Sequence, residues 1–149
     1  LSHVPTEAVA SAEAVIARLK GPVTLVGSSL GGFYATYLAE KHDLRAVLVN
    51  PAVLEPLDPG KWVGTHSSWH EGTSFELTGE HVGQLRGYEV AAVTPERYPL
   101  MVETGDQVLD CRHALARYAG CRRIVVRGGE HRFASFPEHL PQVLAFCGI

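Results

Sequence analysis

The most constraining feature of the sequence is residues 23–32, where an apolar run leads into a serine between glycines and then into a helical pattern. Residues 23–26 have the composition of a short buried strand, and residues 30–41 offer aromatic and aliphatic side chains for helix packing. The run between them, Gly27-Ser28-Ser29-Leu30-Gly31, matches the Gly-x-Ser-x-Gly turn that carries a nucleophilic serine. A glycine–serine turn without chemistry is the alternative, which the flanking strand and helix patterns disfavour.

Such a turn makes specific demands on its residues. Its sharpness forces a strained backbone on the central Ser29. Side chains two residues before and two after it would collide, so we expect Gly27 and Gly31 there because they lack a Cβ. The helix that follows presents free backbone N–H groups, and we expect the N–H of Leu30 to be one donor of an oxyanion hole. Ser28 lies off the centre of the motif and is interpreted as a packing or capping residue.

A nucleophilic serine needs a base, and the chain order expected after such a turn is serine, then an acid, then histidine. Of the eight histidines, His131 fits best, because it follows the predicted strand 124–126 through a glycine-containing loop. We assign it as general base and then general acid; a surface-loop histidine is the alternative. Asp106 is the favoured acid because it directly follows the predicted strand 100–104. Asp110, which would cap a helix, and Glu103 remain open.

The rest of the chain alternates short apolar strands with helices. We predict strands over 23–26, 46–49, 100–104 and 124–126, and helices over 5–20, 30–41, 110–118 and 136–146. This alternation predicts an α/β fold, with a mostly parallel sheet covered by helices on both faces. Together with the serine turn, it predicts the α/β-hydrolase fold.

The length of the chain limits the number of domains that it can form. Residues 1–149 have the size of one domain with a real core. Residues 54–98 contain several prolines and glycines and both tryptophans, so we predict a small cap-like insertion there, with one helix over 80–90. A long segment of this kind over a sheet is where substrate selection would occur.

The composition excludes several classes of function. The net charge of −3 and the lack of a clustered Lys/Arg face argue against nucleic acid and anionic membranes as partners. No apolar run approaches the ~20 residues of a membrane span, and no signal peptide is visible.

The cysteines and histidines are the candidates for redox and metal chemistry. The three cysteines, Cys111, Cys121 and Cys147, are odd in number and form no Cys-x-x-Cys pair, which favours reduced thiols and a cytoplasmic location. His66 and His70 have a spacing that could chelate zinc on a helix, but their segment is a poor helix, so we predict no metal site.

Five stretches, taken in order, resemble the small bacterial YqiA-like esterases. They are residues 27–40, 50–53, 78–80, 104–110 and 128–133, and together they extend over nearly the whole chain. The resemblance implies an α/β hydrolase that acts on carboxylic esters, or on thioesters such as acyl-CoA, without a cofactor. It also implies Ser29 as nucleophile, Asp106 as acid and His131 as base, and so favours Asp106 over Asp110.

The sequence departs from this family in two places. Where the family has Gly-Gly-Asp-His-Ser-Phe, this chain has Glu130 before His131 and Arg132 after it, and we expect the arginine to affect substrate approach. The family also opens with a strand and a His-Gly-Phe-type loop that supplies the second oxyanion N–H. Nothing in residues 1–149 matches them, so we expect an N-terminally truncated fold with an unpaired sheet edge. Losing one such donor typically costs ~10²–10³ in turnover.

These observations predict a serine hydrolase that cleaves small-molecule acyl esters or thioesters through an acyl-serine intermediate on Ser29. The alternative from a different class is a catalytically weak or inactive hydrolase-like domain that binds a small acyl ligand or a protein partner. A peptidase or a lipase would keep the same three residues and differ only in its pocket.

Overall fold

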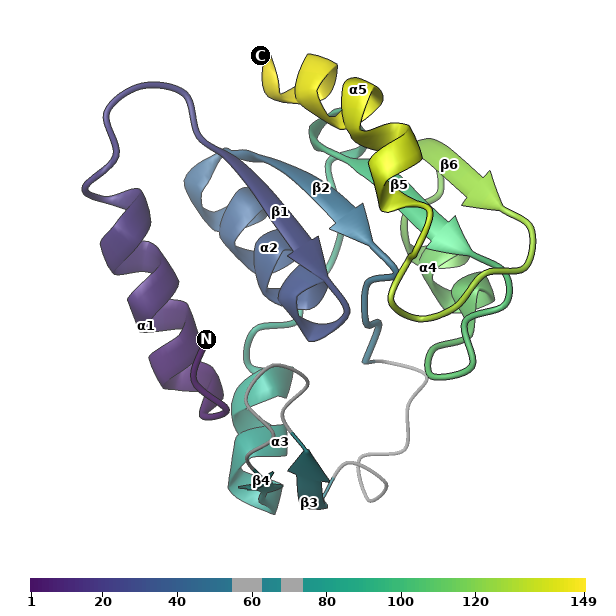
Figure 1. Cartoon of the computed structure of the whole chain (residues 1–149). Coiled ribbons are helices and arrows are strands. Elements are labelled where there is room, and N and C mark those ends of the chain that lie inside the picture. The colour runs from purple at the N-terminus through teal and green to yellow at the C-terminus, as the bar shows by residue number, and fades with distance from the viewer. Residues whose placement is uncertain (55–62, 68–73) are drawn as a thin grey trace. The chain divides into compact units, whose positions relative to one another are not determined.

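The computed structural model describes residues 1–54, 63–67 and 74–149, and these residues form two compact units (Figure 1). The first unit consists of Leu1–Gly21 and Leu54–Glu89, and the second, which we call the sheet unit, of Pro22–Val53 and Val90–Ile149. The segment predicted as an insertion over 54–98 therefore divides at residue 89, and its last part packs with the sheet. In the described parts of the chain, no helix is long and apolar enough to cross a membrane.

The sheet unit is built on four parallel strands. They are β1 (Thr24–Ser28), β2 (Arg45–Val49), β5 (Pro99–Glu103) and β6 (Arg122–Val126), in the order β1-β2-β5-β6. All four were predicted, each with boundaries within two residues. Because the strands are parallel, their carboxyl ends meet at one edge of the sheet, where ligands of open α/β folds bind.

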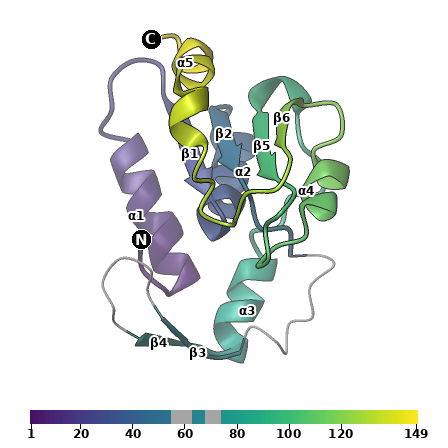
Figure 2. The ribbon, with the colours of Figure 1, turned by 45° about the vertical axis from the view of Figure 1, so that its right-hand side comes forward.

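Helices cover both faces of this sheet, which confirms the predicted fold class. In Figure 1, α2 (Leu30–His42) and α4 (Cys111–Arg117) lie behind the sheet and α5 (Phe136–Cys147) lies in front, and Figure 2 gives the same arrangement after a turn of 45°. Alternation along the strands explains the two layers, since successive side chains point to opposite faces.

The two layers have separate cores. Leu48 and Leu100 belong to the cluster that includes residues of α2 and α4, whereas Val47 and Met101 pack with Phe133 and residues of α5. β2 and β5 are central and almost wholly buried, so each such aliphatic side chain contributes roughly 1.5–3 kcal/mol to folding.

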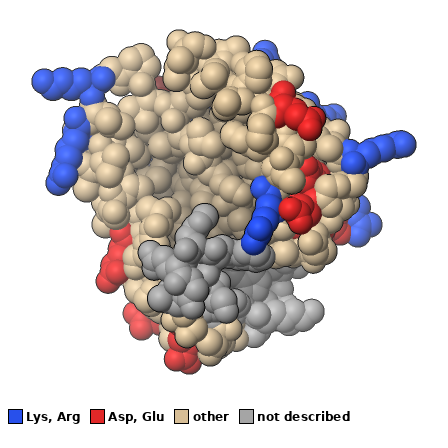
Figure 3. All heavy atoms as spheres, viewed as in Figure 1, with Lys and Arg blue, Asp and Glu red and all other residues tan. Residues whose placement is uncertain are grey.

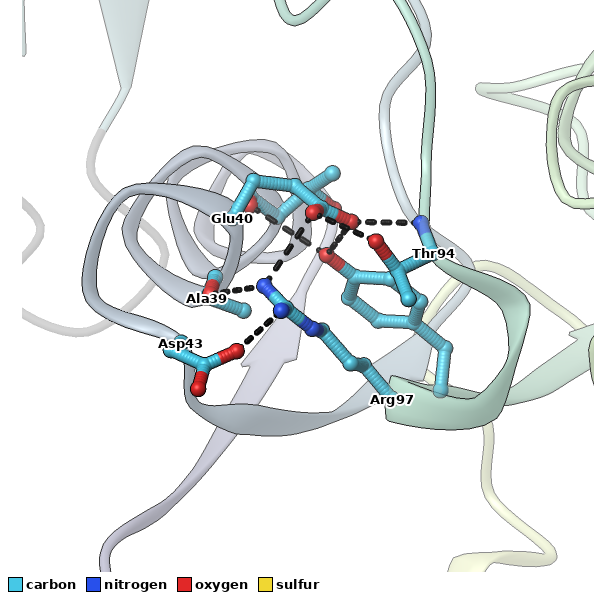
Figure 4. A network of polar contacts seen from close by, with 7 residues as sticks. Ala39, Glu40, Asp43, Thr94 and Arg97 are labelled. Carbon is cyan, nitrogen blue, oxygen red and sulfur yellow. Dashed lines mark hydrogen bonds and ion pairs between the residues drawn. The ribbon is translucent and has the colours of Figure 1, made fainter.

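A polar network fastens the far end of α2 within the sheet unit (Figure 4). Glu40 accepts hydrogen bonds from the N–H of Thr94 at 2.6 Å, its hydroxyl at 2.9 Å and the Tyr98 hydroxyl at 2.7 Å, and it pairs with Arg97 at 3.2 Å. Burial raises the pKa of Glu40, but these donors and the arginine outweigh burial, so its pKa lies below the usual value. Burial and the bond to Glu40 raise the pKa of Tyr98, which therefore stays a neutral donor.

The first unit pairs two helices with a small hairpin. It contains α1 (Pro5–Ile16), β3 (Gly64–Ser67), β4 (Ser74–Leu77) and α3 (Gly79–Arg86), and β3 pairs antiparallel with β4. Thr78 caps α3, since its hydroxyl accepts from the N–H of His81 at 3.3 Å while the His81 ring accepts from the N–H of Thr78. Neither the hairpin nor this cap was predicted, and α3 ends at residue 86 rather than 90. Trp62, Trp69 and His70 lie outside the described residues.

Candidate active site

Ser29 occupies the turn between β1 and α2 in a strained conformation. Its φ of 54° and ψ of −126° are unfavourable for a residue with a side chain, as expected for the predicted turn. The surrounding backbone holds it there. The Ser29 N–H donates to the carbonyl of Val49 at 3.1 Å, and its carbonyl accepts from the N–H groups of Gly32 at 2.9 Å and Ala52 at 3.0 Å. The end of β2 and the segment after it therefore fix the serine from one side.

Of the two glycines predicted to be required around Ser29, the structure requires one. A Cβ on Gly27 would lie 2.3 Å from the carbonyl oxygen of Gly31, so Gly27 is required as expected. A Cβ on Gly31 would meet nothing within 4 Å, so the steric reason predicted for Gly31 is wrong. It is the backbone of Gly31, and not its side-chain position, that faces Gly27. The second tight glycine is Gly32, where a Cβ would lie 2.7 Å from the Cβ of Pro51.

The structure brings Ser29, His131 and Asp106 together, one from each of three loops at the carboxyl edge of the sheet. His131 Nε2 lies 3.0 Å from Ser29 Oγ, and His131 Nδ1 lies 2.7 Å from Asp106 Oδ2. The His131 and Asp106 side chains are 11% and 2% exposed. When Nδ1 carries the ring proton, its N–H donates a hydrogen bond to the Asp106 carboxylate. Nε2 is then the nitrogen that can accept the serine hydroxyl proton.

Asp106 is itself held in place. Its second oxygen, Oδ1, accepts hydrogen bonds from the N–H groups of Val108 at 2.8 Å and Leu109 at 2.9 Å. These bonds leave Oδ2 directed at His131. Because backbone donors fix the carboxylate, the imidazole ring that it contacts is fixed as well.

The two other candidate acids have other partners. Asp110 caps α4, accepting from the N–H of Arg112 at 2.9 Å and pairing with its guanidinium group. Hydrogen bonds from Arg112 hold the pKa of Asp110 well below its usual range. Glu103 is buried and accepts hydrogen bonds from Glu130 and Ser135. The acid that contacts His131 is therefore Asp106.

The remaining predicted residues are placed as follows. Leu30 is the first residue of α2, where a backbone N–H has no acceptor within the helix. Arg132 is exposed beside His131. His66 lies in β3, and among the described residues no group of three or more His, Cys, Asp or Glu is placed to hold a metal ion. On the face shown in Figure 3, Lys and Arg side chains are dispersed, most of them toward the edges, and are not gathered in one patch.

Sequence reasoning missed Asn50 as part of this region. Its amide nitrogen donates to the carbonyls of Glu130 at 3.2 Å and His131 at 3.1 Å, and its amide oxygen accepts from the N–H of Glu103 at 2.9 Å. A signal was present, because an asparagine directly after a buried strand is the residue type that tolerates a positive φ, here 39°.

Solved structures with this fold come from several organisms. Est1E from Butyrivibrio proteoclasticus matches with a TM-score of 0.63 at 16% identity, over 93% of this chain and 64% of that one. The esterase domain of a Rhodothermus marinus protein gives 0.64 at 14% identity, over 94% and 67%. An alpha-beta serine hydrolase homologue from Coxiella burnetii gives 0.58 at 15% identity, over 91% and 56%. The chain thus has the α/β-hydrolase fold and spans between 56% and 67% of the length of these relatives.

A family model adds to this likeness of fold. The model of the Uncharacterised protein family (UPF0227) matches residues 1–148, almost the entire chain. The chain therefore belongs to this family, the YqiA-like family that its motifs resemble.

Proposed function

We propose that this chain is a serine hydrolase that cleaves carboxylic esters or acyl thioesters through an acyl intermediate on Ser29. The observation that carries the proposal is the continuous contact from Ser29 Oγ to His131 Nε2, at 3.0 Å, and from His131 Nδ1 to Asp106, at 2.7 Å. Nucleophile, base and orienting acid lie within hydrogen-bond reach, which is the requirement for activating a serine.

In the first half of the reaction, His131 Nε2 takes the hydroxyl proton as Ser29 Oγ attacks the acyl carbon. Asp106 stabilises the imidazolium that forms and keeps Nδ1 protonated. When the tetrahedral intermediate collapses, the bond to the leaving alcohol or thiol breaks, and the proton on Nε2 passes to the leaving group. The acyl group then remains as an ester on Ser29.

The second half uses the same groups, with water as the nucleophile and Ser29 Oγ as the leaving group. His131 takes a proton from a water molecule, whose oxygen attacks the acyl carbon. The bond from that carbon to Ser29 Oγ then breaks, and the proton returns from Nε2 to the serine. The carboxylic acid leaves, and the free hydroxyl is restored.

In both halves, negative charge develops on the former carbonyl oxygen. Leu30 supplies a backbone N–H next to the nucleophile at the positive end of α2, which suits it to that charge. Each oxyanion-hole donor typically contributes about 2.7–4 kcal/mol to transition-state stabilisation. We therefore assign the Leu30 N–H to the oxyanion.

The ester class has support from the relatives in fold. One of them is an esterase domain, and another, Est1E, has a structure with ferulic acid bound. An acyl donor with a good leaving group, such as p-nitrophenyl butyrate, is therefore a suitable first substrate. A short-chain acyl-CoA would test the thioester branch, and the ratio of the two kcat/KM values would give the preference.

The decisive experiment is labelling with a fluorophosphonate probe, followed by mass spectrometry to locate the modified residue. We expect modification at Ser29 in the native chain, and no labelling of the Ser29→Ala variant. Ser28→Ala is the matched control, because it changes the neighbouring hydroxyl and should leave labelling intact. Labelling of Ser29→Ala at the native rate would contradict the proposal. A folded native chain that is neither labelled nor active would instead favour a hydrolase-like domain that only binds its ligand.

A further inference from the structure

Glu103 is a charged residue that is buried in the structure, with 1% of it exposed. It ends β5, three residues before Asp106, yet it has no step in the reaction proposed above. A buried carboxylate is costly unless charge-assisted hydrogen bonds replace its lost hydration. The partners of Glu103 therefore show what keeps the charge in this position.

Those partners lie on the segment that carries His131. Oε2 of Glu103 accepts from the backbone N–H of Glu130 at 2.6 Å, and Oε1 accepts from the hydroxyl of Ser135 at 2.5 Å. The segment from β6 to α5 has neither helix nor strand hydrogen bonds of its own at Glu130 and His131. The carboxylate thus supplies an acceptor that regular structure would otherwise provide.

Asn50 completes the support from the neighbouring strand end. Its amide oxygen accepts from the N–H of Glu103, which leaves its amide nitrogen to donate to the carbonyls of Glu130 and His131. Both side chains are buried, Asn50 with 3% exposed. The backbone on both sides of the peptide bond between Glu130 and His131 is therefore held by two buried polar side chains.

The loop is also shaped to fit the carboxylate. Gly129 has a φ of 74°, and a Cβ built on it would lie 2.2 Å from Glu103 Oε2. The backbone can approach the carboxylate this closely only because residue 129 has no side chain.

We propose that Glu103, together with Asn50, is a positioning residue that sets the backbone of the His131 loop so that the imidazole reaches Ser29 and Asp106 at once. This inference rests on the proposed function only for its effect on turnover. The placement of His131 is itself measurable without turnover.

The test compares Glu103→Leu with Glu103→Gln. Leucine fills the same space but offers no acceptor to the Glu130 N–H, whereas glutamine still accepts from it and can donate to the Ser135 hydroxyl. We expect Glu103→Leu to lower kcat by about 10²-fold with KM changed by less than about threefold, as for a misplacement of reacting groups by ~1 Å. Glu103→Gln should recover at least about tenfold of that loss.

Glu40→Gln is the matched control. It also alters a glutamate that accepts several hydrogen bonds, but Glu40 lies eleven residues along α2 from Ser29, about 16 Å at the rise of a helix. We expect it to lower stability and leave kcat at the native level for the folded fraction. A kcat for Glu103→Leu equal to that of Glu40→Gln would reduce Glu103 to a stabilising residue and overturn the proposal.

A second readout separates positioning from activity. The hydrogen-bonded Nδ1 proton of His131 should give a downfield proton resonance, retained in Glu103→Gln and lost in Glu103→Leu. Its persistence in folded Glu103→Leu would overturn the proposal. If the native chain neither hydrolyses esters nor labels at Ser29, but the resonance still depends on Glu103, the proposed function fails and the positioning role stands.

Hydrogen exchange in the native chain extends the test to the case in which Glu103→Leu does not fold. The Glu130 amide should be protected to the same degree as amides of β5, although it lies in a loop. Exchange of this amide at the rate of an open loop would overturn the proposal without any variant.

Discussion

Replacing Gly27 by alanine tests the geometry of the serine turn most directly. The new Cβ would lie 2.3 Å from the carbonyl oxygen of Gly31, 2.6 Å from its carbonyl carbon and 2.8 Å from the nitrogen of Gly32. All three atoms are backbone, so no side-chain rotation relieves the overlap. The start of α2 must therefore move away from β1, and Ser29 lies between the two.

The cost follows from this overlap. Overpacking of a well-packed region costs about 1–3 kcal/mol, which for a chain of this size lowers Tm by roughly 2–4 °C per kcal/mol. A shift of the nucleophile approaching ~1 Å lowers the rate by about 10²-fold. We therefore expect Gly27→Ala to unfold at lower urea concentration and to react with a fluorophosphonate probe about 10²-fold more slowly.

Gly31→Ala is the matched control for this prediction. Its Cβ meets nothing within 4 Å, and alanine is favoured over glycine in a helix by about 1 kcal/mol. This variant should therefore be as stable as the native chain or more so. Equal unfolding midpoints and equal labelling rates for the two variants would refute the steric account of the turn.

Three further predictions concern acidic residues. Asp106→Asn should lower kcat by about 10³–10⁴-fold with little change in KM, because the imidazole of His131 loses its orienting carboxylate. Steady-state kinetics of ester hydrolysis measure this loss, and Asp110→Ala is the control. Asp110→Ala should lower Tm, since α4 loses its cap, and keep kcat within about twofold; a larger loss for Asp110 than for Asp106 would reverse the assignment. The pKa of Glu40 is lowered in the folded chain from 4.5, so its stabilisation is complete above that value and is lost as the pH falls through the folded pKa. Urea midpoints of native and Glu40→Gln chains should therefore differ most at neutral pH and converge at acid pH; a constant difference would contradict this.

The sheet unit could be predicted because its signals are local. Each of the four strands contains a short apolar run bounded by glycine, proline or polar residues, and the central β2 and β5 are buried on both faces. The hairpin of β3 and β4 could not be predicted in this way. Its strands have four residues each. β3 contains no large apolar residue, and the alternation of β4 is limited to Phe75 and Leu77.

The residues of the candidate site likewise fall into two groups, those that local sequence patterns indicate and those whose roles depend on distant contacts. Ser29, Asp106 and His131 are each marked by the element just before them. Their order along the chain favours Ser29 and His131 but leaves Asp110 and Glu103 open as acids beside Asp106, which the family resemblance favours. Gly32 and Glu103 take their roles from residues far away in sequence, such as Pro51 and Ser135, and no local pattern reports such contacts. Because these partners are distant in sequence, the sequence alone indicates Glu103 only as a candidate acid and not as a support for the His131 loop.

The positive φ of Ser29 has a consequence for how this chain can evolve. A strained backbone conformation of this kind costs of order 1–3 kcal/mol, and glycine would adopt it freely. Ser29→Gly should therefore give a more stable chain than the native one, and Ser29→Ala should not. Selection for stability alone would favour glycine at position 29, so a nucleophilic serine, as proposed for this turn, would be kept at a cost in stability.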